Sequence, residues 1–169
     1  MVQMRGDQHD PLRFVAGSLL FGVGLGGLAD GIVLHQVFQW HSIASTRIPR
    51  DNLQALQTNQ MLDGLFHLAT TLILLLGFGL LWRGWEQQAR STGNLHALVG
   101  LGAIGWGVFH VFDHLVFHEL LDLHDIRQDA EHVALYNWGF FALGIALIGV
   151  GWLMIRKRGR IGAPSAEGC

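Results

Sequence analysis

Hydrophobic and polar positions along this chain fall into long blocks rather than short periods. Four apolar blocks run over about residues 14–38, 61–82, 95–117 and 136–155. Each holds roughly 20 residues or more, which is the length an α-helix needs to cross a hydrocarbon core about 30 Å thick. None shows the alternation of polar and apolar residues expected of membrane strands. The pattern predicts an all-α integral membrane protein with one four-span domain over residues 1–158 and a disordered tail at 159–169.

The short connections between the blocks favour antiparallel neighbours, so we expect two tandem helical hairpins in a four-helix bundle. Asp51 and Asn52 are typical of a helix start and place it before the second apolar block. Small residues four apart allow helix backbones to approach closely in lipid. Such pairs are Gly22 with Gly26, Gly27 with Gly31, and Ala103 with Gly107.

The first span repeats in the third at an offset of 83 residues, through a shared string Asp-x4-His-x5-His. Polar coincidences inside apolar segments are less expected by chance than apolar ones, so we infer a duplicated hairpin. The second and fourth spans match more weakly. The matched pairs are Asp30 with Asp113, His35 with His118, His41 with His124, and Asp63 with Asn137.

Composition narrows the function classes. Half of the residues are hydrophobic, 14% are charged and the net charge is -2, which favours a lipid bilayer over a nucleic acid as partner. The single cysteine, Cys169, excludes an internal disulfide and a cysteine metal motif. Eight Lys and Arg residues fall on the side of both termini and three on the other. The positive-inside rule therefore predicts cytoplasmic termini and outward loops at about 39–60 and 118–135, which in the inner membrane of a bacterium would face the periplasm.

Histidine and aspartate gather at the outward end of the spans. Eight of the ten histidines and three aspartates lie in the outer half of a span or just beyond it. Ionisable groups are costly in a membrane and normally mark a functional site. We therefore expect a metal site, with candidate ligands His35, Asp63, His67, His110, His114, His118, Asp30 and Asp113, and with His41, His124 and His132 ranked second.

Spacing supports part of this set. His110, His114 and His118 are four residues apart and stack on one face of an α-helix, as do Asp63 and His67. Asp30 and His35 lie about 140° apart around a regular α-helix. Either those two residues belong to different coordination shells of the metal, or the helix opens near Gly31.

These residues carry a resemblance. The stretches Asp30-Gly-Ile-Val-Leu-His35-Gln-Val-Phe-Gln-Trp-His41, Asp63-Gly-Leu-Phe-His67 and His110-Val-Phe-Asp113-His114 resemble a family of small, histidine-rich, four-span bacterial membrane proteins of unknown function. The resemblance covers about residues 14–155. It implies a genomic context near a copper-handling assembly factor of cytochrome oxidase, and it carries over no catalytic residue.

Imidazole and carboxylate ligands without cysteine or clustered methionine favour copper or iron, with zinc as a further option. More than four candidate ligands allow two ions. We expect a metal-dependent oxidoreductase. One alternative is a copper-handling protein that serves a respiratory oxidase. Others are a haem-binding electron carrier, with axial ligands such as His67 and His114, and a proton relay. His118-Glu119-x-x-Asp122 departs from the zinc-protease motif at its last position. The sequence leaves the enzyme assignment, the substrate, the metal and any homo-oligomer open.

Overall fold

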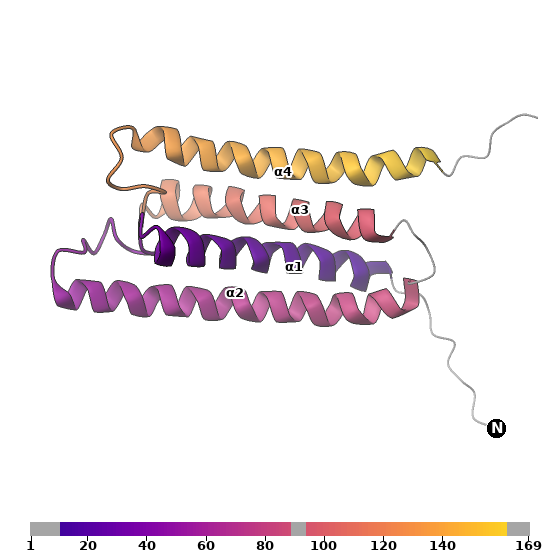
Figure 1. Ribbon diagram of the computed structural model, residues 1–169, viewed down its shortest axis with the longest axis horizontal. Helices are drawn as coiled ribbons and strands as arrows, with labels where there is room; N and C mark the ends of the chain where they lie inside the picture. The colour runs from indigo at the N-terminus through magenta and orange to yellow at the C-terminus, as the bar shows by residue number, and fades with distance from the viewer. Residues whose placement is uncertain (1–10, 89–93, 162–169) are drawn as a thin grey trace, which may run out of the picture.

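The computed structural model describes residues 11–88 and 94–161 and contains four long α-helices (Figure 1). They are α1 (Pro11–Asp30), α2 (Leu53–Gln88), α3 (Asn94–Asp113) and α4 (Val133–Ile161), and two π-helical segments, η1 (Gly31–Val37) and η2 (His114–Leu120), continue α1 and α3. All four are long and apolar enough to cross a membrane, over Leu12–Val37, Leu53–Gly84, Leu95–Leu120 and Val133–Arg156. The expected all-α membrane bundle is confirmed. Most of the predicted tail lies outside the described residues, and α4 extends to Ile161.

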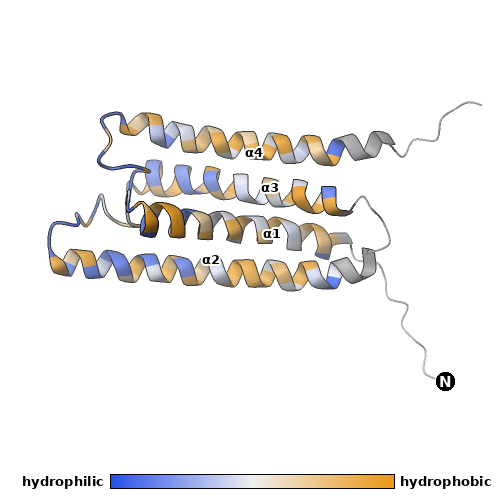
Figure 2. Ribbon diagram, in the orientation of Figure 1, coloured by the Kyte–Doolittle hydropathy of each residue, from blue (hydrophilic) through white to orange (hydrophobic). Residues whose placement is uncertain are grey.

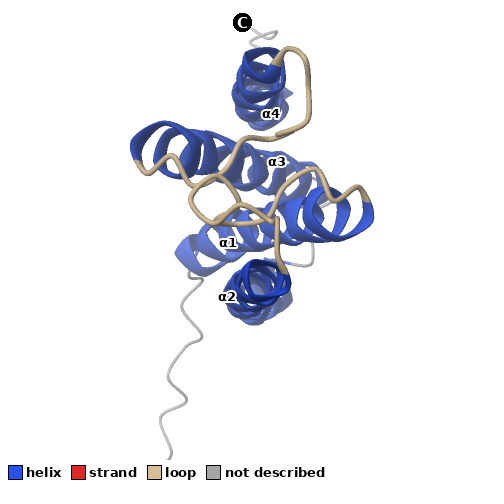
Figure 3. Cartoon of the chain, turned by 90° about the vertical axis from the view of Figure 1, so that its left-hand side faces the viewer, coloured by secondary structure: helices blue, strands red, loops and turns tan. Residues whose placement is uncertain are grey.

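The helices stand in a row, in the order α2, α1, α3, α4 (Figures 1 and 3). The main packing contacts join α1 to α2, α3 to α4, and α1 to α3. α1 and α3 therefore form the centre, and α2 and α4 present leucines such as Leu65, Leu72 and Leu143 outwards, as expected for lipid-facing helices. The segments 38–52 and 121–132 both lie at the same end, where polar residues also gather (Figure 2).

Helix α2 begins where the sequence predicted. The Asn52 side-chain oxygen accepts a hydrogen bond from the Ala55 backbone N–H at 2.9 Å, which satisfies one of the unpaired donors of the first turn. Helix α2 therefore starts at Leu53, before the second apolar block.

Glycines set the spacing of the two central helices. A Cβ added at Gly22 would lie 2.1 Å from the Gly102 carbonyl oxygen, and one at Gly105 would lie 2.1 Å from the Leu19 oxygen. These two contacts are related by the 83-residue offset, so α1 and α3 cross around a pseudo-twofold axis. The predicted close approach of helices at small residues is confirmed at Gly22.

The internal repeat is visible in the backbone. η1 and η2 are offset by 83 residues, and each ends on the same hydrogen bond, Phe38 N–H to Val33 O at 2.8 Å and Leu121 N–H to Val116 O at 2.9 Å. The next residues, Gln39 and Asp122, both adopt positive φ, 52° and 48°. The halves therefore share one local conformation around their polar residues.

Candidate metal centre

The π-helical turns bring aspartate and histidine together. A π-helix places residues five apart above one another, because its hydrogen bonds run from i to i+5. Asp30 Oδ2 lies 3.2 Å from His35 Nε2, and Asp113 Oδ2 lies 3.0 Å from His118 Nε2. The regular-helix separation of Asp30 and His35 therefore does not apply, because the helix widens at Gly31.

The residues at positive φ turn the chain back across the end of the bundle. This turn places His41 and His124 inside, each less than 2% exposed. The His41 Nδ1 donates to the Ile126 carbonyl at 2.8 Å, and the His124 Nδ1 donates to the Ile43 carbonyl at 3.1 Å. Ile43 and Ile126 are themselves repeat partners, so each half of the chain holds the imidazole of the other.

These backbone contacts fix the free nitrogen of each ring. A neutral imidazole that donates through Nδ1 presents a lone pair on Nε2. The Nε2 atoms of His41 and His124 are buried without a hydrogen-bond partner. Metal-binding histidines normally have this arrangement, with the second ring nitrogen tied to a carbonyl or carboxylate.

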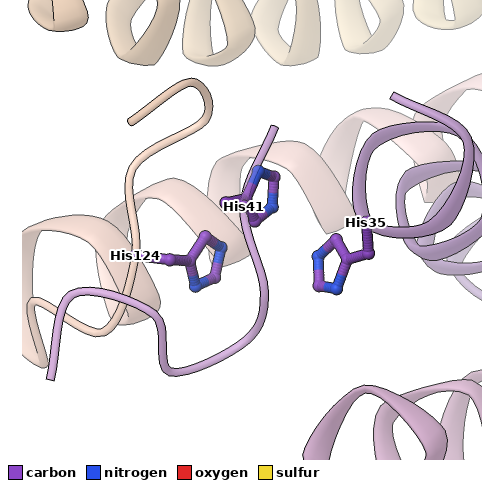
Figure 4. Close-up of side chains that lie close together, drawn as sticks. All are labelled: His35, His41 and His124. Atoms are coloured by element: carbon purple, nitrogen blue, oxygen red, sulfur yellow. The ribbon is translucent and has the colours of Figure 1, made fainter. Parts of the chain in front are cut away.

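Two groups of donors meet here. His35, His41 and His124 each offer a ligand atom within 4.8 Å of the others, and Asp113, His118 and His124 do the same. Figure 4 shows the first three rings close together. The rings of His41 and His124 are stacked, and their centroids are 4.5 Å apart. His124 belongs to both groups, which therefore form one continuous centre across the repeat.

Asp63 stands behind His35. Its Oδ1 accepts the His35 Nδ1–H at 3.0 Å and the Ile43 backbone N–H at 2.8 Å. The Asn137 Oδ1 accepts the Ile126 N–H at 2.9 Å, so the weak match of Asp63 with Asn137 in the sequence corresponds to matched positions in the structure. Asp63 thus orients both the His35 imidazole and the loop at Ile43.

The two loop histidines are held neutral. Burial lowers the pKa of His124 to about 4. Burial, with the nearby imidazoles of His124 and His35, lowers the pKa of His41 well below its usual value of 6.5. Neutral rings keep the lone pairs that a metal ion needs.

A polar pocket of about 310 Å³ borders this centre. Its walls come from η1, the following loop and the start of α2, and they include His35, Asp63, Arg50 and Gln60. Small polar solutes in this pocket would lie beside His35, on the α2 side of the centre.

The remaining predicted residues lie around the centre. On the α2 side, His67 Nε2 lies near Gly31. On the α4 side, His114 packs against Trp138 and Phe141. His132 is exposed in the turn directly before α4.

His110 accepts a hydrogen bond from the indole of Trp106 at 2.8 Å. Neither of the two donor groups includes His67, His110, His114 or His132.

The sequence ranked His41 and His124 second, yet in the structure both belong to the donor groups. The signal that could have found them is the repeat itself, since both histidines obey the same 83-residue offset. The carbonyl partners at Ile43 and Ile126 carry no signal in side-chain chemistry, because any residue supplies a carbonyl.

Comparison with known proteins identifies a family for this chain. No curated protein and no solved structure matches the chain. The model of a family described as "Predicted membrane protein (DUF2243)" matches residues 17–158. This match spans all four helices, so the chain belongs to the DUF2243 family of predicted membrane proteins.

Proposed function

We propose that this membrane protein binds transition metal, up to two ions, through the His35, His41 and His124 group and the Asp113, His118 and His124 group. The observation that carries the proposal is the convergence of buried imidazole nitrogens that have no partner. Burying such polar atoms unpaired costs free energy. A metal ion would satisfy several of them at once.

The proposed activity is that of a copper- or iron-dependent oxidoreductase. Imidazole with carboxylate suits Cu(II), Fe, Zn and Mn, and two adjacent donor groups suit a two-ion centre. The side chains of His35, His118 and His124 have no exposed surface. Such depth favours a resident ion over the rapid exchange that a copper-handling protein needs.

Haem is the weaker candidate. Axial imidazoles lie on opposite faces of a porphyrin, whereas the central rings contact one another at 4.4 to 4.5 Å between centroids. The charge distribution of the loops supports an orientation with this centre on the outer side of a bacterial inner membrane.

The test is elemental analysis with an absorption spectrum of the purified protein in detergent. We expect one to two equivalents of copper or iron and no Soret band. His124→Ala should lose most of the metal from both groups, whereas His96→Ala, at an exposed histidine on α3, should lose none. Equal metal content in the two variants, with both folded, would refute the proposal.

A further inference from the structure

A second cavity lies on the other side of the bundle, between α1, α3 and α4. It is a cleft of about 710 Å³ whose walls are nearly all apolar. Its aromatic lining includes Trp40, Trp106, Tyr136 and Phe140. Two polar side chains, Asp30 and His110, also line it, and both are at least nine-tenths buried.

Of these two side chains, His110 carries a hydrogen-bond donor without a partner and Asp30 carries an acceptor without one. An indole N–H only donates, so the bond from Trp106 Nε1 to His110 Nε2 places the proton of a neutral His110 ring on Nδ1. That Nδ1–H has no partner, and neither has Asp30 Oδ1. Native proteins rarely leave such groups unmatched, so each points to a missing partner.

Most of the cleft lies among the membrane-spanning segments, and the loop residues Trp40 and Ile126 line its outer end. Its lining residues on α1, α3 and α4 fall inside the spans Leu12–Val37, Leu95–Leu120 and Val133–Arg156. Lining residues Val33 and Leu143 are 40% and 51% exposed, on surfaces that would face lipid. A ligand would therefore enter sideways from the bilayer and would have to be lipid-soluble.

We propose that this cleft binds a quinol, a lipid-soluble ring that carries a phenolic hydroxyl. One hydroxyl both donates and accepts, so it would donate to Asp30 Oδ1 and accept from His110 Nδ1–H. The ring would lie among the aromatic walls and the tail would lie in lipid, as in ligand sites that combine apolar walls with a few placed polar groups. An acyl chain would leave both polar atoms unpaired, and a quinone carbonyl could satisfy only His110.

This proposal goes beyond metal binding and does not depend on it. Asp30 nevertheless links the two features, because its other oxygen, Oδ2, lies 3.2 Å from His35 Nε2 in the first donor group. A bound quinol would stand one carboxylate away from the proposed metal centre.

The test measures calorimetric binding of decylubiquinol to EDTA-treated protein in lipid nanodiscs, so that a failure of metal binding cannot affect the result. The informative pair is Gly139→Phe and Gly149→Phe. Both glycines lie on α4, and an added Cβ at either one meets nothing within 4 Å, but only Gly139 lines the cleft. Gly139→Phe should weaken binding at least tenfold and Gly149→Phe should leave it unchanged.

Two further arms identify the ligand class. His110→Leu should weaken decylubiquinol binding by about tenfold, the scale of one buried hydrogen bond, and decylbenzene, which lacks ring oxygens, should bind at least tenfold more weakly. Absence of decylubiquinol binding, or equal binding by the two glycine variants, would overturn the proposal. Equal binding of decylbenzene would also overturn it and would identify the cleft as a non-specific lipid groove.

Discussion

Replacing Gly22 by alanine should force the two central helices apart. The new Cβ would lie 2.1 Å from the Gly102 carbonyl oxygen, whereas ordinary contact begins at 3.4 Å. The difference of about 1.3 Å falls on backbone atoms, so no side-chain rotation can relieve it. Overpacking of this kind typically costs about 1–3 kcal/mol, and we expect Gly22→Ala to lower the free energy of unfolding by that amount.

The same displacement should reach the metal centre. Gly22 lies eight residues from Asp30, about 12 Å along the helix. Metal–ligand distances normally stay within about 0.2 Å of their ideal values, so a fraction of the displacement would distort a centre built from both halves. We expect metal affinity to fall about tenfold, within the range seen when the support of a metal ligand is removed.

The assay is a pair of titrations in detergent, SDS-induced unfolding followed by circular dichroism and metal binding followed by competition with a chelator. Gly102→Ala is the matched control, because an added Cβ there meets nothing within 4 Å. If Gly22→Ala and Gly102→Ala unfold at the same SDS fraction, the contact of Gly22 with the Gly102 backbone does not set the distance between α1 and α3. If Gly22→Ala is destabilised but binds metal normally, helix spacing does not control the centre.

Three other predictions concern the centre itself. Asp63→Asn should weaken metal binding about 10- to 100-fold, because a neutral amide supports the His35 ring less strongly than a carboxylate. Asp51→Asn, at an exposed carboxylate, should leave metal binding unchanged. Equal chelator competition curves for the two variants would contradict the role of Asp63 in orienting His35. The metal-free protein should lose thermal stability as pH falls from about 6.5 towards 4. Burial lowers the pKa of His124 to about 4, so in this pH range His124 takes up a proton in the unfolded chain but not in the folded protein. An unchanged melting temperature between pH 7 and pH 5 would argue against the burial of His124. His114→Ala should retain more metal than His124→Ala in elemental analysis, since only His124 belongs to the donor groups, and the opposite order would move the centre towards α4.

Much of the fold could be predicted from the sequence, because membrane spans and repeats depend on composition and spacing. Four apolar blocks and the offset that relates His35 to His118 were enough to predict the bundle and its duplication. The π-helical turn was not predictable in the same way. At Gly31 the sequence only indicated that a regular helix could not bring Asp30 and His35 together, and the structure shows how the helix widens to do so.

The candidate site was predictable in content but not in arrangement. Residue types predicted a His/Asp cluster, but backbone carbonyls from the opposite loop orient His41 and His124, and such partners leave no mark in the sequence. The lateral cleft was also absent from the sequence interpretation. It depends on where small residues such as Gly26 and Gly139 leave space between helices, which only packing determines.

The pair Asp63 and Asn137 makes the duplicated site unequal. In the first half a carboxylate accepts the His35 Nδ1–H, whereas the Nδ1 of His118 has no partner in the second half. An anionic partner makes an imidazole a stronger base and a better ligand. Two ions bound here would therefore differ in affinity, so a titration would fill the positions one after the other, and the protein could combine two different elements in one centre.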